Sequence, residues 1–198
     1  SQPISGTKTI KQTGGDYSSF SAAVIDLNTN GVGAGGVTFN VDAGFIDTAA
    51  NITISTSTSS ASNPIVFQKS GSGNNPVIVA ASGTGSLDGI IKISGTDHIT
   101  FDGINLIENS TNTTANSRME WGYALLKASV SNGCRYVIIK NSNIVLNENN
   151  SNTTYGIYSA NHTTTSGTEL TISDTNGTNS YNSFYSNFIT NVAYGIYL

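Results

Sequence analysis

Asp97 and Asp102 are two carboxylates of this sequence whose spacing is compatible with acid–base chemistry. Glycoside hydrolysis needs two carboxyl groups about 5–9 Å apart, and a turn between these residues would bring them to that distance. A further acid nearby, Asp88, is separated from them by apolar residues, so the three form no cluster. A lyase would often need clustered carboxylates to hold Ca²⁺. We therefore predict no catalytic residue, no metal and no cofactor.

Other residue types with reactive side chains are also isolated in the sequence. Lys92 and Lys127 occupy matching places in a repeat, so a basic ladder could bind an acidic polysaccharide or serve in a lyase. Because no general base accompanies them, we expect both charges to face solvent. His98 and His162 lack the spacing of metal ligands and are expected to be plain surface or turn residues. Cys134 has no partner cysteine and no histidine beside it, which indicates a structural thiol.

Aromatic residues are concentrated in the second half of the chain. Eight of the nine tyrosines lie between residues 123 and 197, and Tyr155 and Tyr158 recur as Tyr194 and Tyr197 in a repeat. Aromatic rings on a rigid sheet can stack on sugar rings or bind a protein, although alternation would turn half of them into the core. The predicted ligand is a polysaccharide or surface glycan. Its predicted binding residues, the first two on a loop, are Trp121, Tyr123, Tyr155 and Tyr158.

One helix and a series of strands would position these side chains. Residues 16–30 carry apolar residues at helical spacing, with Asp16 or Ser18 as the cap and Asn30–Gly31 as the end. From residue 37 the pattern changes to alternation, which is typical of strands. The further predicted strands, separated by turns rich in Gly, Ser and Asn, are 52–55, 64–69 and 76–80.

A repeat begins near residue 88. Segment 90–94 matches 125–129, 156–160 and 195–198. The spacing between copies varies, which indicates that insertions lie in loops, here 108–121 and 147–154, while the strands stack.

The second strand of each copy gives a more detailed register. Segments 99–106 and 137–144 place Phe101 on Ile139 inside and Asp102 on Lys140 outside, about 4.8 Å apart. The turn position that follows tolerates left-handed dihedrals and is occupied by Gly103, Asn141 and Asn187.

These features predict an all-β protein, specifically a right-handed parallel β-helix with a short N-terminal capping helix. It would form one elongated, monomeric domain over residues 1–198, with the cap at 16–30 and the coils at 37–198. A β-sandwich is the alternative, but a sandwich does not repeat its sequence.

The motifs also resemble a known group of proteins. The segments GGDYSSFSAAV at 14–24 and GVTFNV at 36–41 resemble the start of large secreted repeat proteins, which gliding and biofilm-forming bacteria export through the type IX secretion system. The segments NPIVFQ at 63–68, DHITFDG at 97–103 and YGIYL at 194–198 resemble pectin-lyase-like β-helices. The Asp-Asp pair and Gly-His-Gly segment of β-helix hydrolases are absent from this sequence.

The resemblance implies a secreted or cell-surface bacterial location and secretion or surface machinery as partners. We expect a non-catalytic role as an adhesin, stalk or binding surface. The alternative is a polysaccharide lyase or glycoside hydrolase whose active site lies in further C-terminal coils. A third possibility is a region that serves mainly as secretion cargo. Because residue 198 falls within an apolar strand, we expect a C-terminal continuation or another chain to cover that end.

Charge and hydropathy exclude two classes of partner. The net charge is −4, from 12 acidic and 8 basic residues, which disfavours nucleic acid because its binding needs clustered Lys and Arg. No segment is long and apolar enough to span a membrane. The first residues show no basic stretch followed by an apolar one, so we expect any signal peptide to have been removed already.

Overall fold

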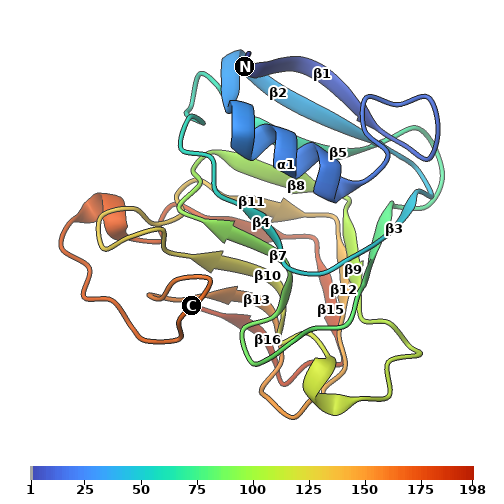
Figure 1. The fold of residues 1–198 in the computed structure, drawn as a ribbon, viewed down its shortest axis with the longest axis vertical. Helices are drawn as coiled ribbons and strands as arrows, with labels where there is room; N and C mark the ends of the chain where they lie inside the picture. The colour runs from blue at the N-terminus through green and yellow to red at the C-terminus, as the bar shows by residue number, and fades with distance from the viewer. Residues whose placement is uncertain (1) are drawn as a thin grey trace.

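The computed structural model describes residues 2–198 as three parallel β-sheets and one α-helix (Figure 1). Sheet A contains, in spatial order, β1 (Ile4–Ile10), β2 (Val32–Asp42), β5 (Ile65–Ser70), β8 (Ile99–Asp102), β11 (Ile138–Lys140) and β14 (Ser183–Tyr185). Sheet B contains β3 (Ile46–Ala49), β6 (Val77–Ala80), β9 (Asn105–Ile107), β12 (Asn143–Val145) and β15 (Phe188–Thr190). Sheet C contains β4 (Ile52–Ile54), β7 (Gly89–Ser94), β10 (Trp121–Leu126), β13 (Tyr155–Ser159) and β16 (Tyr194–Tyr197).

The chain visits the sheets in a fixed cycle. From β2 onward, each strand of sheet A is followed by one of sheet B and then one of sheet C. Neighbouring strands within each sheet pair in parallel, for example β5 with β8 and β7 with β10. Figure 1 shows the sheets as three walls, with the strands of sheet B at the right. We call three consecutive strands, one from each wall, a coil. The architecture is all-β and is compatible with the predicted parallel β-helix.

Aromatic side chains stack inside the walls at one matching position of sheet A. Phe39, Phe67 and Phe101 are buried, with ring centroids 4.5 Å and then 5.3 Å apart. Ile139 and Phe184 continue the column in the next two coils. Parallel in-register pairing places equivalent side chains on top of one another, so alternation within each strand is enough to build a continuous core.

Helix α1 (Phe20–Asn30) covers the first coil and contacts β1, β3 and β4. It begins later than predicted, because the cap is neither Asp16 nor Ser18. The Ser19 hydroxyl accepts from the Ala22 N–H, and the Asp16 carboxylate instead bonds Thr9. Gly31, with φ 72°, ends the helix as predicted. Within residues 2–198, no helix has the length and apolarity that crossing a membrane requires.

The predicted register is confirmed in sheet A and wrong in part of sheet C. Phe101 pairs with Ile139 and Asp102 with Lys140, as expected. Lys92, however, pairs with Ala124 rather than with Lys127. The prediction aligned the two lysines because they are the same residue type. The register is set instead by the inward–outward alternation of side chains, which places Lys92 beside Ala124.

The predicted turn position holds for two coils and shifts in the third. Gly103 and Asn141 have φ of 70° and 57°, but the equivalent residue of the next coil is Ser186, with φ 54°. Asn187 follows that turn, where its Oδ1 accepts from the Ser142 N–H and its Nδ2 donates to the Ile139 carbonyl. The side-chain amide of Asn187 therefore links its own coil to the backbone of the preceding coil.

Three of the longer connections correspond to predicted insertions or lie near the site. The loops 108–120 and 146–154 match the predicted insertions and include the short helix η1 (Ala115–Ser117). The third, loop 160–182, contains η2 (Thr175–Gly177) and was not singled out by the sequence. Loops 81–88, 146–154 and 160–182 all flank strands of sheet C, and they frame the site described next.

Candidate functional site

The four predicted ligand residues lie on β10 and β13, two neighbouring strands of sheet C. Trp121 and Tyr123 were expected on a loop, which is wrong because the insertion ends at Glu120 and both residues belong to β10. Tyr155 and Tyr158 belong to β13. The fold therefore brings the four residues to one sheet but distributes them between its two faces.

Tyr123 points into the core. Its ring is fully buried 5.1 Å from that of Phe101, and its hydroxyl donates to the Ile104 carbonyl over 3.0 Å. Burial raises the pKa of this phenol. Tyr123 is thus a core residue with a satisfied hydroxyl, and the outer face of sheet C is formed without it.

Five aromatic residues on the outer side of sheet C stack along the direction of the coils. The rings of Trp121 and Tyr158 lie 4.8 Å apart, those of Tyr158 and Tyr197 5.4 Å apart, and those of Tyr155 and Tyr194 5.3 Å apart. Each pair is nearly parallel, and such pairs contribute about 0.5–1.5 kcal/mol beyond their buried area. We call Trp121, Tyr155, Tyr158, Tyr194 and Tyr197 the aromatic face.

His162 joins the aromatic face from loop 160–182. It was expected on the surface or in a turn, but its side chain is buried. Its Nδ1 lies 2.8 Å from the Thr163 carbonyl and its Nε2 lies 3.0 Å from the Tyr158 hydroxyl. A carbonyl only accepts, so Nδ1 carries a proton, and in the neutral imidazole Nε2 is then the acceptor for the Tyr158 hydroxyl. Burial raises the pKa of Tyr158 to about 12, which keeps it a neutral donor.

Two buried carboxyl groups lie where the chain turns from sheet B into sheet C. Glu120 Oε1 accepts from the side-chain amides of Asn150 and Asn152, at 3.0 and 3.1 Å, and its Oε2 accepts from the Asp88 N–H at 2.9 Å. Burial raises the pKa of Glu120 despite these hydrogen bonds. Burial also opposes ionisation of Asp88, but hydrogen bonds from Asn51 and from the backbone of Gly85 and Thr84 outweigh it and lower its pKa.

A cavity of about 220 Å³ lies between the aromatic face and the surrounding loops. Leu87 and Gly167 bring loops 81–88 and 160–182 together, since Leu87 Cδ2 would lie 3.7 Å from a Cβ at Gly167. The lining combines aromatic carbon with hydroxyl, amide and carboxyl groups, including those of Ser86, Glu120, Trp121, Asn152, Tyr158 and His162. The cavity can therefore hold a small ligand that has both an apolar face and polar edges.

The two lysines expected to face solvent are both buried, so that prediction is wrong. Lys127 continues the alternation that turns Tyr123 and Leu125 inward, and within residues 2–198 its Nζ has no hydrogen-bond partner. Lys92 points outward but lies under loop 81–88, where its Nζ donates to the Leu87 carbonyl over 3.2 Å. Burial lowers the pKa of both amines.

The other side chains that could act as acids, bases or nucleophiles form ion pairs or hydrogen bonds within the fold. Asp97 forms an ion pair with Arg135 at 2.9 Å, and Asp102 forms one with Lys140 at 3.1 Å. The buried Cys134 thiol lies 3.2–3.3 Å from two backbone carbonyls, and burial raises its pKa to about 12, opposite to what a nucleophile needs. Across residues 2–198, no three His, Cys, Asp or Glu side chains are grouped so as to hold a metal ion.

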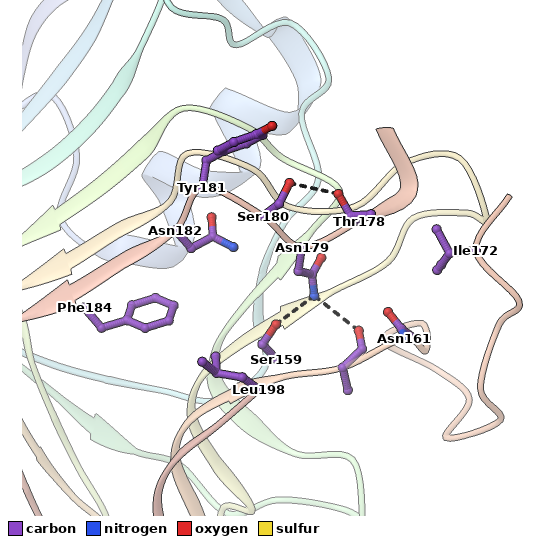
Figure 2. Close-up of a pocket in the computed structure, with 11 residues that line it drawn as sticks. Ser159, Asn161, Ile172, Thr178, Asn179, Ser180, Tyr181, Asn182, Phe184 and Leu198 are labelled. Carbon is purple, nitrogen blue, oxygen red and sulfur yellow. Dashed lines mark hydrogen bonds between the residues drawn. The ribbon is translucent and has the colours of Figure 1, made fainter. Parts of the chain in front are cut away.

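A larger cavity, about 510 Å³, lies beside the last coil (Figure 2). Its walls are uncharged side chains of the last coil and of loop 160–182, such as Asn161, Tyr181 and Leu198. The side-chain amide of Asn179, another lining residue, donates to Ser159 Oγ at 3.0 Å and to the Ala160 carbonyl at 3.3 Å (Figure 2). Phe184, at an inward position of sheet A, also lines it. This cavity thus combines the interior of the last coil with a loop.

Comparison with protein-family models, with curated proteins and with solved structures finds no match for this chain. The coil order and the parallel register therefore define its class as an all-β protein of stacked parallel sheets. The aromatic face and its cavity define the site for which a function can be argued.

Proposed function

We propose that this chain is a non-catalytic, right-handed parallel β-helix, a region of a large secreted or cell-surface bacterial protein, and that its aromatic face binds a polysaccharide or surface glycan. The cycle of the chain through three parallel sheets supports the β-helix. The motifs at 14–24 and 36–41, which resemble type IX secretion cargo, support export and a surface role as an adhesin or stalk.

The single observation that carries the binding role is the aromatic face beside a polar cavity. Tyr194 and Tyr197 are 55% and 44% exposed, while Trp121 is almost fully buried beneath Tyr158. An aromatic ring offers carbon surface to the C–H face of a sugar, and the hydroxyl and amide groups of the cavity can bond the sugar hydroxyls. The same surface thus supplies both kinds of contact that a saccharide needs.

The site is also preorganised. Glu120 fastens loop 146–154 through Asn150 and Asn152, and His162 fastens loop 160–182 to Tyr158. Residues that are ordered before the ligand arrives lose less conformational entropy on binding. The carboxylates of Asp97 and Asp102 are held by cations, which favours binding over hydrolysis as the role of this chain.

Affinity electrophoresis of the full chain in gels containing polysaccharides tests the proposal. We expect retardation in at least one polysaccharide, weakened roughly tenfold by Tyr155→Ala, as for a central aromatic contact. Tyr185→Ala is the control, because Tyr185 lies on sheet A and, at 49% exposed, is more accessible than the half-buried Tyr155. No retardation in any polysaccharide, or equal losses in both variants, would contradict a binding role for the aromatic face.

A further inference from the structure

We infer that the ligand of the aromatic face is an uncharged saccharide, of which one ring enters the cavity. The inference rests on the proposed function and narrows it to one chemical class. It follows from the positions of the charged side chains around the site rather than from the aromatic residues themselves.

The basic residues of the chain are either engaged or remote from the aromatic face. Of the eight Lys and Arg residues, Arg135 and Lys140 pair with acids, and Lys127 is buried in the core. Arg118, on loop 108–120, donates to the carbonyls of Asn112 and Asn149. Lys69 belongs to β5 of sheet A, and Lys8 and Lys11 lie in and after β1, at the opposite end of the stack from β16.

Lys92 contacts Leu87 of the cavity lining, and two acids lie near its charge. Its amine lies under loop 81–88, bonded to the Leu87 carbonyl, and it interacts electrostatically with Asp88 and Glu120. Uronate and sulfate groups are bound in proteins chiefly by charge-assisted hydrogen bonds from Arg or Lys. An anionic sugar would meet the Glu120 carboxyl in the cavity and find no such donor available, so this class is disfavoured.

A cationic amino sugar is disfavoured for a complementary reason. The carboxyl oxygens of Glu120 already accept three hydrogen bonds, from Asn150, Asn152 and the Asp88 N–H. Those of Asp88 accept from Asn51 and from the backbone of loop 81–88. The acids thus serve to fasten the loops, and a bound ammonium group would compete with contacts that shape the cavity.

The size of the cavity limits what enters it. Its volume of about 220 Å³ lies below the roughly 300–1,000 Å³ of sites that enclose drug-sized ligands. One sugar ring fits this space better than two. The remaining groups at the rim, such as those of Ser86, Asn152 and Thr153, are neutral hydroxyls and amides that match sugar hydroxyls.

The test compares polysaccharides of three charge classes at low and high salt, using the full chain. A neutral β-glucan and a neutral mannan represent the proposed class, with polygalacturonate and chitosan as the anionic and cationic classes. We expect retardation only by a neutral polymer, with an affinity that changes less than twofold with salt, because no ion pair forms. Ser86→Trp should fill the cavity mouth and abolish binding, whereas Ser82→Trp, in the same loop but outside the lining, should not.

The outcomes separate this inference from the proposed function. Retardation by polygalacturonate or chitosan that is lost at high salt and on Tyr155→Ala would overturn the neutral class while leaving a glycan-binding face. Neutral binding that survives Ser86→Trp would overturn the assignment of the ring to the cavity. If the chain bound none of the polymers, the result would contradict the proposed function, and therefore also the inference that rests on it.

Discussion

The Tyr158 hydroxyl donates to His162 Nε2 over 3.0 Å and so joins strand β13 of sheet C to the loop that follows the same strand. The contact is completed by the Thr163 carbonyl, which fixes the tautomer of the imidazole. The His162 ring also lies 5.7 Å from that of Trp121, so one side chain closes the cavity and packs the aromatic face. His162 therefore both holds loop 160–182 against sheet C and forms part of the cavity wall.

Replacing His162 with Phe should loosen loop 160–182 while keeping most of the aromatic packing. Removing the acceptor deletes the hydrogen bond of the half-buried Tyr158 hydroxyl, at a cost of about 0.5–1.5 kcal/mol in the free energy of unfolding. We expect limited proteolysis to cut loop 160–182 several times faster. Tyr17→Phe serves as the control, because it also removes a tyrosine hydrogen bond, to Asp26, but beside β1 at the opposite end of the stack. Equal cleavage of the two variants would show that the Tyr158 contact does not hold the loop.

One step of the core column could be predicted from the sequence, because its two residues occupy the same place in similar strand segments. Phe101 with Ile139 and Asp102 with Lys140 lie in segments of equal length, where alternation alone sets the register. The pairing of Tyr155 with Tyr194 follows from the same regularity. For Lys92, residue identity was a poor guide, because Lys127 lies three residues beyond the true partner, Ala124, and points inward whereas Lys92 points outward.

The site itself was only partly predictable. Trp121, Tyr155 and Tyr158 were identified by residue type and repeat, and the structure brings them together on one face. The inward orientation of Tyr123 depends on where β10 begins, which the preceding insertion obscures. The contributions of His162 and Glu120 depend on how loops fold back over sheet C, and such packing leaves no periodic signal in the sequence.

Lys127→Met should stabilise the protein. The lysine amine is buried without a hydrogen-bond partner, whereas methionine fills a similar volume with no polar atom to desolvate. We expect a gain of about 1–3 kcal/mol in the free energy of unfolding at neutral pH, measured by urea denaturation. Lys69→Met, at a partly exposed position of sheet A, is the control and should change stability by less than about 0.5 kcal/mol.

The same lysine predicts a pH dependence. Burial lowers the pKa of Lys127 in the folded state below its ordinary value of 10.5, so the unfolded chain binds more protons between these two values. The contribution of Lys127 to the free energy of unfolding therefore becomes more favourable as the pH rises between these two pKa values. Because buried tyrosines titrate with opposite sign at high pH, the informative quantity is the difference between the wild type and Lys127→Met. That difference should shrink as pH approaches 10.5, and a constant difference would exclude titration as its cause.

Cys134 should resist alkylation in the folded protein. Its thiol is fully buried, and burial raises its pKa to about 12, so little thiolate exists at neutral pH. We expect iodoacetamide to leave the native mass unchanged and to add one carbamidomethyl group after unfolding in urea. Cys134→Ala should fold and bind glycan as the wild type does. Rapid labelling of the native chain would indicate that the segment around Cys134 opens.

The phenylalanine column should show a gradient of stability from the middle of the stack to its last coil. Phe67 is fully buried between Phe39 and Phe101, so Phe67→Ala removes contacts on both sides and leaves a cavity that the neighbouring coils restrain from closing. A loss of about 3–5 kcal/mol in the free energy of unfolding is expected. Phe184 occupies the equivalent position in the last coil but is only partly buried, so Phe184→Ala should lose less than half as much. Urea denaturation followed by circular dichroism measures both variants, and equal losses would mean that something covers Phe184 in solution.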